Sequence, residues 1–391
     1  MKKFFLAIMA IVVMTTSFVS CKTDEPSKGS EGISRSIGSG ETLHLKAGED
    51  YLLDGPLIIE DGGVLNIDAG TVIKAKKGFS NYILVLQGGK INANGTAEKP
   101  IRMTANIDNA VAGHWGGLII NGKAPLTSGQ TTASTEIHTA HVYGGTNPAD
   151  NSGVLTYITL EYTGARSSAD VEHNGLTLNG VGNGTKIENI YVVEGADDGI
   201  EFFGGSVNVK NLLVVNSDDD MFDFTQGYNG TLENAYGIWE KGFTSTESDP
   251  RGIEADGNFD GNFPGHTNQA DFTVKNMTID LRLDHNNDKT TQMQDVIKIR
   301  RGAKATVINA LVKGIGATGD LIDMGDKKGF GDTASSISLT NALTNNFAGK
   351  EINNKATIDG VEETRDFPNV KIEAGNTGCP TDIFAWTKYA F

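Results

Sequence analysis

The hydrophobic and polar positions of this chain repeat in short segments. One segment places apolar residues around a fixed asparagine and reads, for example, IENIYV from Ile187 and VKNLLV from Val209. The asparagines of its six copies are Asn189, Asn211, Asn234, Asn276, Asn309 and Asn341. The first two intervals are 22 and 23 residues, and the later ones fit one such period plus an insertion, or two periods. A fixed period of this length is typical of a repeat architecture.

A second short segment follows these copies at a similar distance along the sequence. Its five versions read GIEFF, MFDFT, GIEAD, VIKIR and LIDMG. Its apolar and polar side chains alternate, so on a strand they face opposite sides. Apolar pairs such as Ile200 with Phe202, and Phe222 with Phe224, would face one side. The polar positions that would face the other side are Glu201, Asp223, Glu254, Lys298 and Asp323.

Short strands of this kind cannot bury their apolar sides alone, whereas stacked coils bury a continuous core. The pattern therefore predicts an all-β chain folded as a parallel β-helix over residues 41–350, with three short strands and three turns in a coil of 22 residues. An up-and-down barrel is the alternative, but hairpin repeats would not align side-chain columns in one direction. The asparagines would stack at a corner, where their amides hydrogen-bond from coil to coil and tolerate a left-handed backbone. Residues 351–391 break the pattern and are expected to cap the last coil, since an open sheet edge invites aggregation.

Three segments near the N-terminus resemble the opening coils of secreted right-handed β-helix proteins: GGVLNIDAGTVIKA from Gly62, YILVLQGGKINANGTAEKPIRMTA from Tyr82 and HWGGLIINGKAP from His114. Together with NGLTLNGVGNGT and DDGIEFFGG, they make residues 45 to 345 similar to a family of β-helix lipoproteins of the Bacteroidota. The resemblance implies a right-handed parallel β-helix at the outer membrane. It implies almost nothing about biochemical activity.

The first 20 residues combine Lys2 and Lys3 with an apolar run and end before Cys21, which is typical of a secretory signal peptide with a lipobox. We expect lipidation, including palmitate, at Cys21 and a flexible Ser/Gly-rich tether over residues 21–40. The acidic run at residues 23–25 resembles a surface-export signal, so the expected location is the outer membrane, facing the cell exterior. With Cys21 lipidated, Cys379 has no disulfide partner and is expected to be a buried structural thiol.

The chain is acidic. Its formal net charge is −16, and removal of the two leader lysines leaves 31 − 49 = −18. Such a surface repels the phosphate backbone, so nucleic acid is excluded as a partner.

Two acidic stretches, GADDGIEFFGG and SDDDMFDFTQG, align at an offset of 22 residues. Strand alternation predicts that four carboxylates point outward together, and calcium suits such a set of hard oxygen ligands. These possible calcium ligands are Asp197, Glu201, Asp219 and Asp223. By the same alternation, the side chains of Asp198 and Asp220 would point inward, and they are expected to cap backbone amides. The alternatives are a solvated acidic ladder compensated by Arg251, Lys298, Arg300 and Arg301, and direct catalysis.

For catalysis, a hydrolase needs an acid and a second carboxylate, which Asp219, Asp220 and Asp223 could supply, and a calcium-dependent lyase needs a base such as Lys298 or Arg300. The histidine-glycine motif of polygalacturonases and a full lyase signature are absent from the sequence. The leading prediction is therefore a module that binds glycan or another cell-surface polymer, with Trp239 and Tyr228 as candidates for stacking on sugars. A polysaccharide-cleaving enzyme and a structural subunit that partners an outer-membrane protein are the alternatives.

Overall fold

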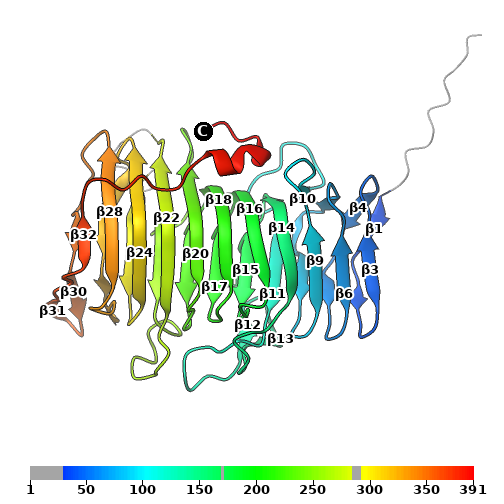
Figure 1. Ribbon diagram of the computed structural model, residues 1–391, viewed down its shortest axis with the longest axis horizontal. Coiled ribbons are helices and arrows are strands. Elements are labelled where there is room, and N and C mark those ends of the chain that lie inside the picture. Colours follow the sequence, from blue (N-terminus) through cyan, green and yellow to red (C-terminus); the bar gives the residue numbers. More distant parts are fainter. Residues whose placement is uncertain (1–29, 169–170, 284–291) are drawn as a thin grey trace, which may run out of the picture.

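The computed structural model describes residues 30–168, 171–283 and 292–391. The chain winds into a right-handed parallel β-helix, whose coils stack along the long axis from the N-terminal to the C-terminal end (Figure 1). Two long sheets form its walls, a 15-stranded sheet A and a 13-stranded sheet B. The predicted signal peptide, Cys21 and the first part of the tether lie outside the described residues.

Nearly all neighbouring strands in the two sheets pair in parallel. Sheet A has the spatial order β1 (Glu31–Gly32), β4 (Asp50–Leu53), β7 (Val72–Ala75), β10 (Ile101–Ala105), β14 (Gly153–Glu161), β16 (Lys186–Gly195), β18 (Asn208–Ser217), β20 (Thr231–Trp239), β22 (Asp271–Leu281), β24 (Lys304–Gly314), β28 (Ser336–Leu343) and β32 (Val370–Ile372), with β3 (Thr42–Leu45), β6 (Val64–Ile67) and β9 (Lys90–Asn94) beside its first strands. Sheet B runs β2 (Ser36–Ile37), β5 (Leu57–Ile59), β8 (Gly78–Val85), β11 (Trp115–Asn121), β15 (Leu176–Asn179), β17 (Ile200–Phe203), β19 (Phe222–Thr225), β21 (Arg251–Asp256), β23 (Met293–Arg300), β25 (Thr318–Asp323) and β29 (Ile352–Asn353), with β26 (Gly325–Asp326) and β27 (Gly329–Phe330) at one side. Two hairpins project from the coils, β12 (Ala133–Thr135) with β13 (His138–Tyr143), and β30 (Lys355–Ile358) with β31 (Val361–Thr364).

The coils change their design at β14. Before it, each coil has three strands, as predicted. β14 pairs with β9 through its first half and with β10 through its second half, so two strands of the earlier coils merge into one long strand. Tyr157, at the junction of the two halves, has a left-handed backbone with φ 53°. The later coils therefore have one long bent strand in sheet A and one short strand in sheet B.

The predicted asparagine ladder lies at this bend. Each amide nitrogen donates to the side-chain oxygen of the preceding asparagine, at 2.8 to 2.9 Å along Asn189, Asn211, Asn234, Asn276 and Asn309. All five have φ between 54° and 60°, which a short amide side chain tolerates better than a branched one. The longer intervals are single coils with inserted loops, because β20 pairs directly with β22 and β22 with β24.

The sixth asparagine does not join the ladder. The register shifts between Val307 and Ala310, and Asn341 then pairs with Val312. The side-chain oxygen of Asn309 accepts hydrogen bonds from the backbone amides of Thr377 and Gly378 instead. The prediction for Asn341 was therefore wrong, because the chain end caps the ladder.

The inward columns predicted for sheet B are confirmed. Ile200 pairs with Phe222, Phe222 with Ile253, Ile253 with Ile297 and Ile297 with Ile322, and all are fully buried. Aromatic rings stack along the axis of the core, with centroids 5.1 Å apart for Phe202 and Phe224 and 4.2 Å apart for Phe224 and Phe272. This interior fixes the register of the polar columns on the outside.

Both ends differ from the predicted boundaries. β1 and β2 pair with β4 and β5, so the solenoid begins at Glu31, within the predicted tether. At the other end, β29 and β32 still pair with the preceding coil inside the predicted cap. The last residues, 376–391, form a C-terminal strap that folds back along sheet A and contains the short helix η2 (Asp382–Thr387) (Figure 1).

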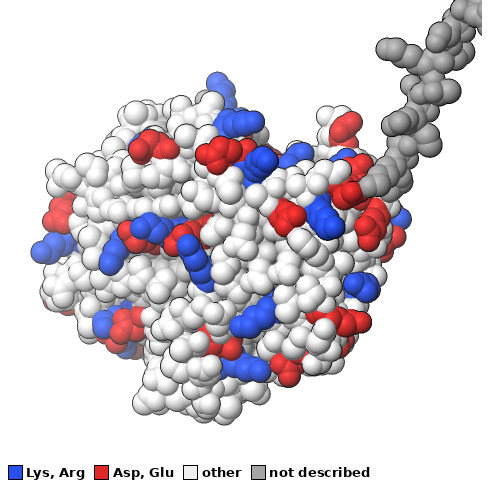
Figure 2. Space-filling model, turned by 45° about the vertical axis from the view of Figure 1, so that its right-hand side comes forward, with Lys and Arg blue, Asp and Glu red and all other residues white. Residues whose placement is uncertain are grey.

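The strap packs on an apolar patch of sheet A. Phe384 is fully buried in a cluster with Leu213, Val215, Tyr236 and Ile238. Cys379 is buried beside it, and burial raises the pKa of its thiol, so the predicted structural role is confirmed. Within the described ranges, no helix is long and apolar enough to cross a membrane. Figure 2 shows acidic and basic side chains interleaved over one face of the solenoid.

Candidate functional site

The outer face of sheet B carries a column of charged side chains. Glu201 pairs with Asp223, Asp223 with Glu254, Glu254 with Lys298 and Lys298 with Asp323, as the strand alternation predicted. A second polar column precedes it by three residues, in which Arg251 pairs with Asp295 and Asp295 with Asp320. The β-helix thus brings together carboxylates that are far apart in the sequence.

This face is covered, which the sequence did not predict. The β12–β13 hairpin lies over it: Asn121 on β11 donates to Thr135 at 2.6 Å, and Tyr143 donates to Gln226 at 2.6 Å. Asp220 and Asp223, on this face, are only 3% and 9% exposed. The alternative of a solvated acidic ladder was therefore wrong for these strands.

Asp198 lies on the same outer face, and not inward as predicted. One of its carboxylate oxygens lies within 4.8 Å of those of Glu201 and Asp223. It does cap an amide, because the backbone N–H of Asp220 donates to it at 2.9 Å. Strict alternation of side chains holds only within β17, which begins at Ile200. The turn residues before Ile200 therefore need not alternate, and the side chain of Asp198 can point outward.

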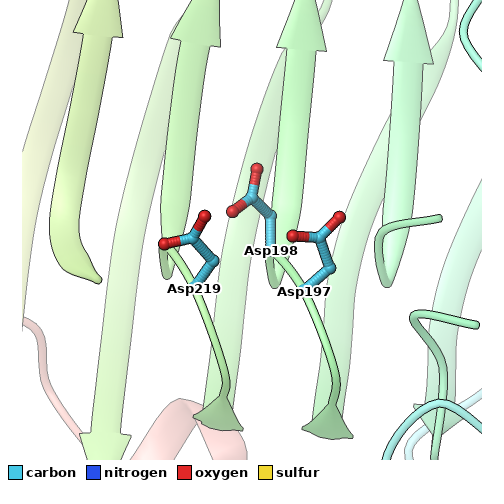
Figure 3. Close-up of side chains that lie close together, drawn as sticks. All are labelled: Asp197, Asp198 and Asp219. Carbon is cyan, nitrogen blue, oxygen red and sulfur yellow. The ribbon is translucent and has the colours of Figure 1, made fainter. Parts of the chain in front are cut away.

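The predicted calcium ligands do not form one group. Asp197 and Asp219 cluster with Asp198 at the starts of β17 and β19, where Figure 3 shows the three side chains on neighbouring coils. Glu201 and Asp223 form a second group, again with Asp198. A third group joins Asp220, Asp223 and Glu254. The groups overlap, so the carboxylates make a continuous acidic row.

Burial dominates the electrostatics of this row. It raises the pKa of Asp198, Glu201 and Asp223 well above the usual range of carboxyl groups, and neighbouring carboxylates raise the pKa further. Burial likewise raises the pKa of Asp219 to about 7, with Glu254 as the next cause. Glu201 and Asp223 each have a carboxylate oxygen within 4.8 Å of one of the other. Several oxygens are buried without a hydrogen-bond partner, including one each of Asp219, Asp220 and Asp223.

The four predicted basic residues lie beside the later strands of the row. Arg251 contacts Asp249 at 2.5 Å, Asp295 at 3.6 Å and Asp220 at 3.9 Å, and it also pairs with Glu254. Arg300 and Arg301 both bind Asp256 at 2.7 Å, and Lys298 binds Asp323 at 2.6 Å. These cations neutralise the row from β21 onward.

Two hollows open beside these basic residues. One, of about 530 Å³, is lined by Ser248, Gln292, Gln294, Asp295, Gly319, Asp320, Asp323, Ala348 and Asn353. The other, of about 320 Å³, is lined by Asp249, Arg251, Gln294, Lys298, Arg300, Arg301, Asp326 and Lys327. They share Gln294, and we call them together the groove. Asp219, Asp220 and Asp223, the predicted catalytic carboxylates, line neither hollow, whereas Lys298 lines the second.

A family model for the pectate-lyase-like beta helix domain matches residues 37–390. The chain belongs to this family. Membership agrees with the parallel β-helix and with a polysaccharide-related module in general. No curated protein and no solved structure matches the chain.

In this pectate-lyase-like β-helix, the predicted sugar-stacking residues are structural. Trp239 and Tyr228 are fully buried, and they donate hydrogen bonds to the backbone oxygens of Ser217 at 3.0 Å and Val207 at 2.7 Å. Their proposed contact with a ligand was therefore wrong. A coiled solenoid needs large side chains to fill its interior, and aromatic residues do this best.

The sequence reasoning missed Asp295 as a site residue. Asp295 is 2% exposed and lies 3.8 Å from Lys298. Burial raises its pKa to about 7, while Lys298 and Arg251 act against this and Asp323 and Asp320 add to it. The signal was present, since Arg251, Asp295 and Asp320 each stand three positions before a member of the predicted polar column.

Proposed function

We propose that the protein is a surface-anchored module that binds a partly acidic polysaccharide in the groove over β21, β23 and β25. The observation that carries the proposal is the charge distribution of the groove. Its smaller hollow is lined by five basic and two acidic residues, although the chain as a whole is strongly acidic. Its larger hollow is lined by three aspartates and no basic residue.

Each of the two hollows of the groove suits a different kind of sugar residue. The basic hollow suits the carboxylate of a uronate, because arginine and lysine bind carboxylates strongly. The acidic hollow offers carboxylate and amide oxygens to the hydroxyls of a neutral sugar. Gln294 and Lys327 are exposed and therefore accessible to a polymer. Family membership supports a polysaccharide as the polymer.

The anchor is part of the same proposal. The lipobox ending at Cys21 supports a lipid-anchored protein of the outer membrane that faces outward. Only residues 22–30 separate this cysteine from β1. Metabolic labelling with a palmitate analogue, compared with Cys21→Ala, tests the anchor, and protease treatment of intact cells tests the exposure. Failure to label, or protection from protease, would remove this part of the proposal.

Cleavage of the bound polymer is the second candidate function. Asp295, Asp320 and Asp323 each have a carboxylate oxygen within 4.8 Å of the others. The raised pKa of Asp295 suits a general acid near neutral pH, and Asp323, which Lys298 contacts at 2.6 Å, would be the second carboxyl group. Such an acid and carboxylate pair is what glycoside hydrolysis requires.

One experiment separates binding from cleavage. The mature chain, residues 21–391 with Cys21→Ser to avoid the lipid, is applied to an array of neutral and uronate-containing polysaccharides. Bound polymers are then incubated with the protein and assayed for new reducing ends. Binding without products supports the module, and products lost in Asp295→Asn support the enzyme. Absence of binding to every polysaccharide would contradict both.

A further inference from the structure

The acidic row on sheet B is neutralised on one side only. From β21 onward, each strand of the row carries its own basic side chain or pairs with one. Arg251 lies in the same column as Asp295, and Lys298 in the same column as Glu254 and Asp323. These side chains form the ion pairs described above. No external cation is needed there.

The described part of the chain supplies no such cation to Asp198, Glu201 or Asp223, which lie on β17, on β19 and in the turn before β17. Asp220, in the turn before β19, does contact Arg251, at 3.9 Å. Within the described residues, no lysine, arginine or histidine forms an ion pair with Asp198, Glu201 or Asp223. Like charges opposite each other on a sheet destabilise it. Burial makes this worse, because water cannot screen the carboxylates.

The chain avoids such repulsion elsewhere. On the outer face of sheet A, Glu188 pairs with Lys210, Lys210 with Glu233, and Glu233 with Lys275. That column alternates in charge, although its members are exposed or half-buried. The buried like-charged column on sheet B is therefore the opposite of what the same fold does at its surface.

Unpartnered oxygens point to what is missing. Asn174, only 3% exposed, donates its amide N–H to Glu201 at 2.6 Å, and its amide oxygen has no hydrogen-bond donor. One carboxylate oxygen of Asp223, which is 9% exposed, is likewise buried without a partner. A buried acceptor without a donor is costly unless a cation satisfies it.

We propose that a calcium ion binds between β17 and β19, held by Asp198, Glu201 and Asp223, next to the Asn174 amide that contacts Glu201. Each of the three carboxylates has an oxygen within 4.8 Å of the others, which a single ion can bridge. The donors are hard oxygens without sulfur or imidazole, which favours calcium or magnesium over transition metals. Calcium accepts many protein oxygens in irregular geometry, whereas magnesium keeps several waters, for which this covered site is unsuited.

This ion would join two neighbouring coils under the β12–β13 hairpin. It would act as the counterpart of Arg251, which occupies the corresponding position on the next strand. The site is distinct from the groove, because Asp198, Glu201 and Asp223 line neither of its hollows. The proposal therefore stands independently of polysaccharide binding.

The test uses the mature chain with Cys21→Ser, stripped with EDTA and titrated with calcium chloride in a calorimeter. We expect one calcium ion per chain, and about tenfold or more weaker binding in Glu201→Gln and in Asp223→Asn, because affinity follows the charge of the ligand set. Glu233→Gln, which removes a half-buried carboxylate of sheet A, is the matched control and should bind like the wild type. No heat of binding up to millimolar calcium, or equal affinity in both variants, would overturn the proposal.

Thermal unfolding gives a second readout that a general loss of stability cannot imitate. In EDTA, Asp223→Asn should melt above the wild type, since it relieves repulsion. In calcium, Asp223→Asn should melt below the wild type, since the substitution removes a calcium ligand. The same order in both conditions would overturn the site. If either variant fails to fold, anomalous scattering from wild-type crystals grown with calcium decides the matter: a peak between β17 and β19 supports the proposal, and no peak there overturns it.

Discussion

Glu201 and Asp223 lie opposite each other on β17 and β19, with a carboxylate oxygen of each within 4.8 Å of the other and beneath a covering hairpin. Two carboxyl groups can share such a position only if they hold a proton or a cation between them. Further along the column, Glu254 pairs with Lys298, which unites opposite charges on the same face. One column thus contains both a neutralised half and a half that requires an additional positive charge.

The asparagine ladder should contribute measurably to stability. Asn234→Ala removes two side-chain hydrogen bonds and leaves a residue with a β-carbon at φ 60°. We expect a loss of about 3–4 kcal/mol in the free energy of unfolding, from about 1 kcal/mol for each of the two bonds and 1–2 kcal/mol for the backbone. Chemical denaturation measures it.

Two controls separate these contributions. Asn234→Gly loses the same hydrogen bonds but tolerates the left-handed backbone, so it should be less destabilised than the alanine variant. Asn341 lies outside the ladder, so Asn341→Ala should lose the least stability of the three variants. Equal effects at positions 234 and 341 would show that the ladder does not stabilise the coils.

The C-terminal strap should be needed to keep the solenoid monomeric. Phe384→Ala empties a fully buried position against sheet A, and we expect it to cost about 3–5 kcal/mol. Phe391, in the same strap but 42% exposed, is the matched control, and its alanine variant should cost far less. Deletion of residues 376–391 would expose the apolar patch and should produce oligomers in light scattering. A monomeric, equally stable deletion would contradict this role.

Asp295 should make stability depend on pH. Its pKa is about 7 in the folded protein and about 4 in an unfolded chain. Between these values the unfolded chain releases the proton and the folded chain keeps it, so stability is full below about pH 4 and falls as the pH rises to about 7. The loss is at most about 4 kcal/mol for three pKa units.

Asp295→Asn isolates this effect, because it keeps the shape of the side chain and does not titrate. The groups facing Asp295 are Arg251, Lys298, Asp320 and Asp323. Unfolding curves at pH 4 to 8 should fall less steeply for the variant than for the wild type. Parallel curves would mean that Asp295 is ionised in the folded protein throughout.

Much of this architecture was predictable because its pattern is local and periodic. The column from Glu201 to Asp323 follows from strand alternation, and the ladder from Asn189 to Asn309 follows from the repeat. Both need only the spacing of residues within coils. The strap was also signalled: the continuous apolar run at Leu212–Val215 is typical of a strand buried on both faces.

The covering of the site was not predictable in this way. Tyr143 reaches Gln226 across 83 residues, and no periodicity relates the two. Strand alternation alone leaves Asp220 and Asp223 accessible, and they were therefore candidates for catalysis in the alternative of a polysaccharide-cleaving enzyme. The groove depends in the same way on a turn, since Lys327, between β26 and β27, lines the same hollow as Gln294 of β23.

Binding of uronate-containing oligosaccharides tests the central functional claim most directly. Calorimetry compares the mature chain with Lys327→Ala and Gln294→Ala, and with Lys275→Ala on sheet A as the control. Our account predicts saturable binding that both groove variants weaken about tenfold or more and that the control leaves unchanged, with affinity falling as salt is raised. Binding that all three variants retain equally, or no binding to any oligosaccharide, would contradict it.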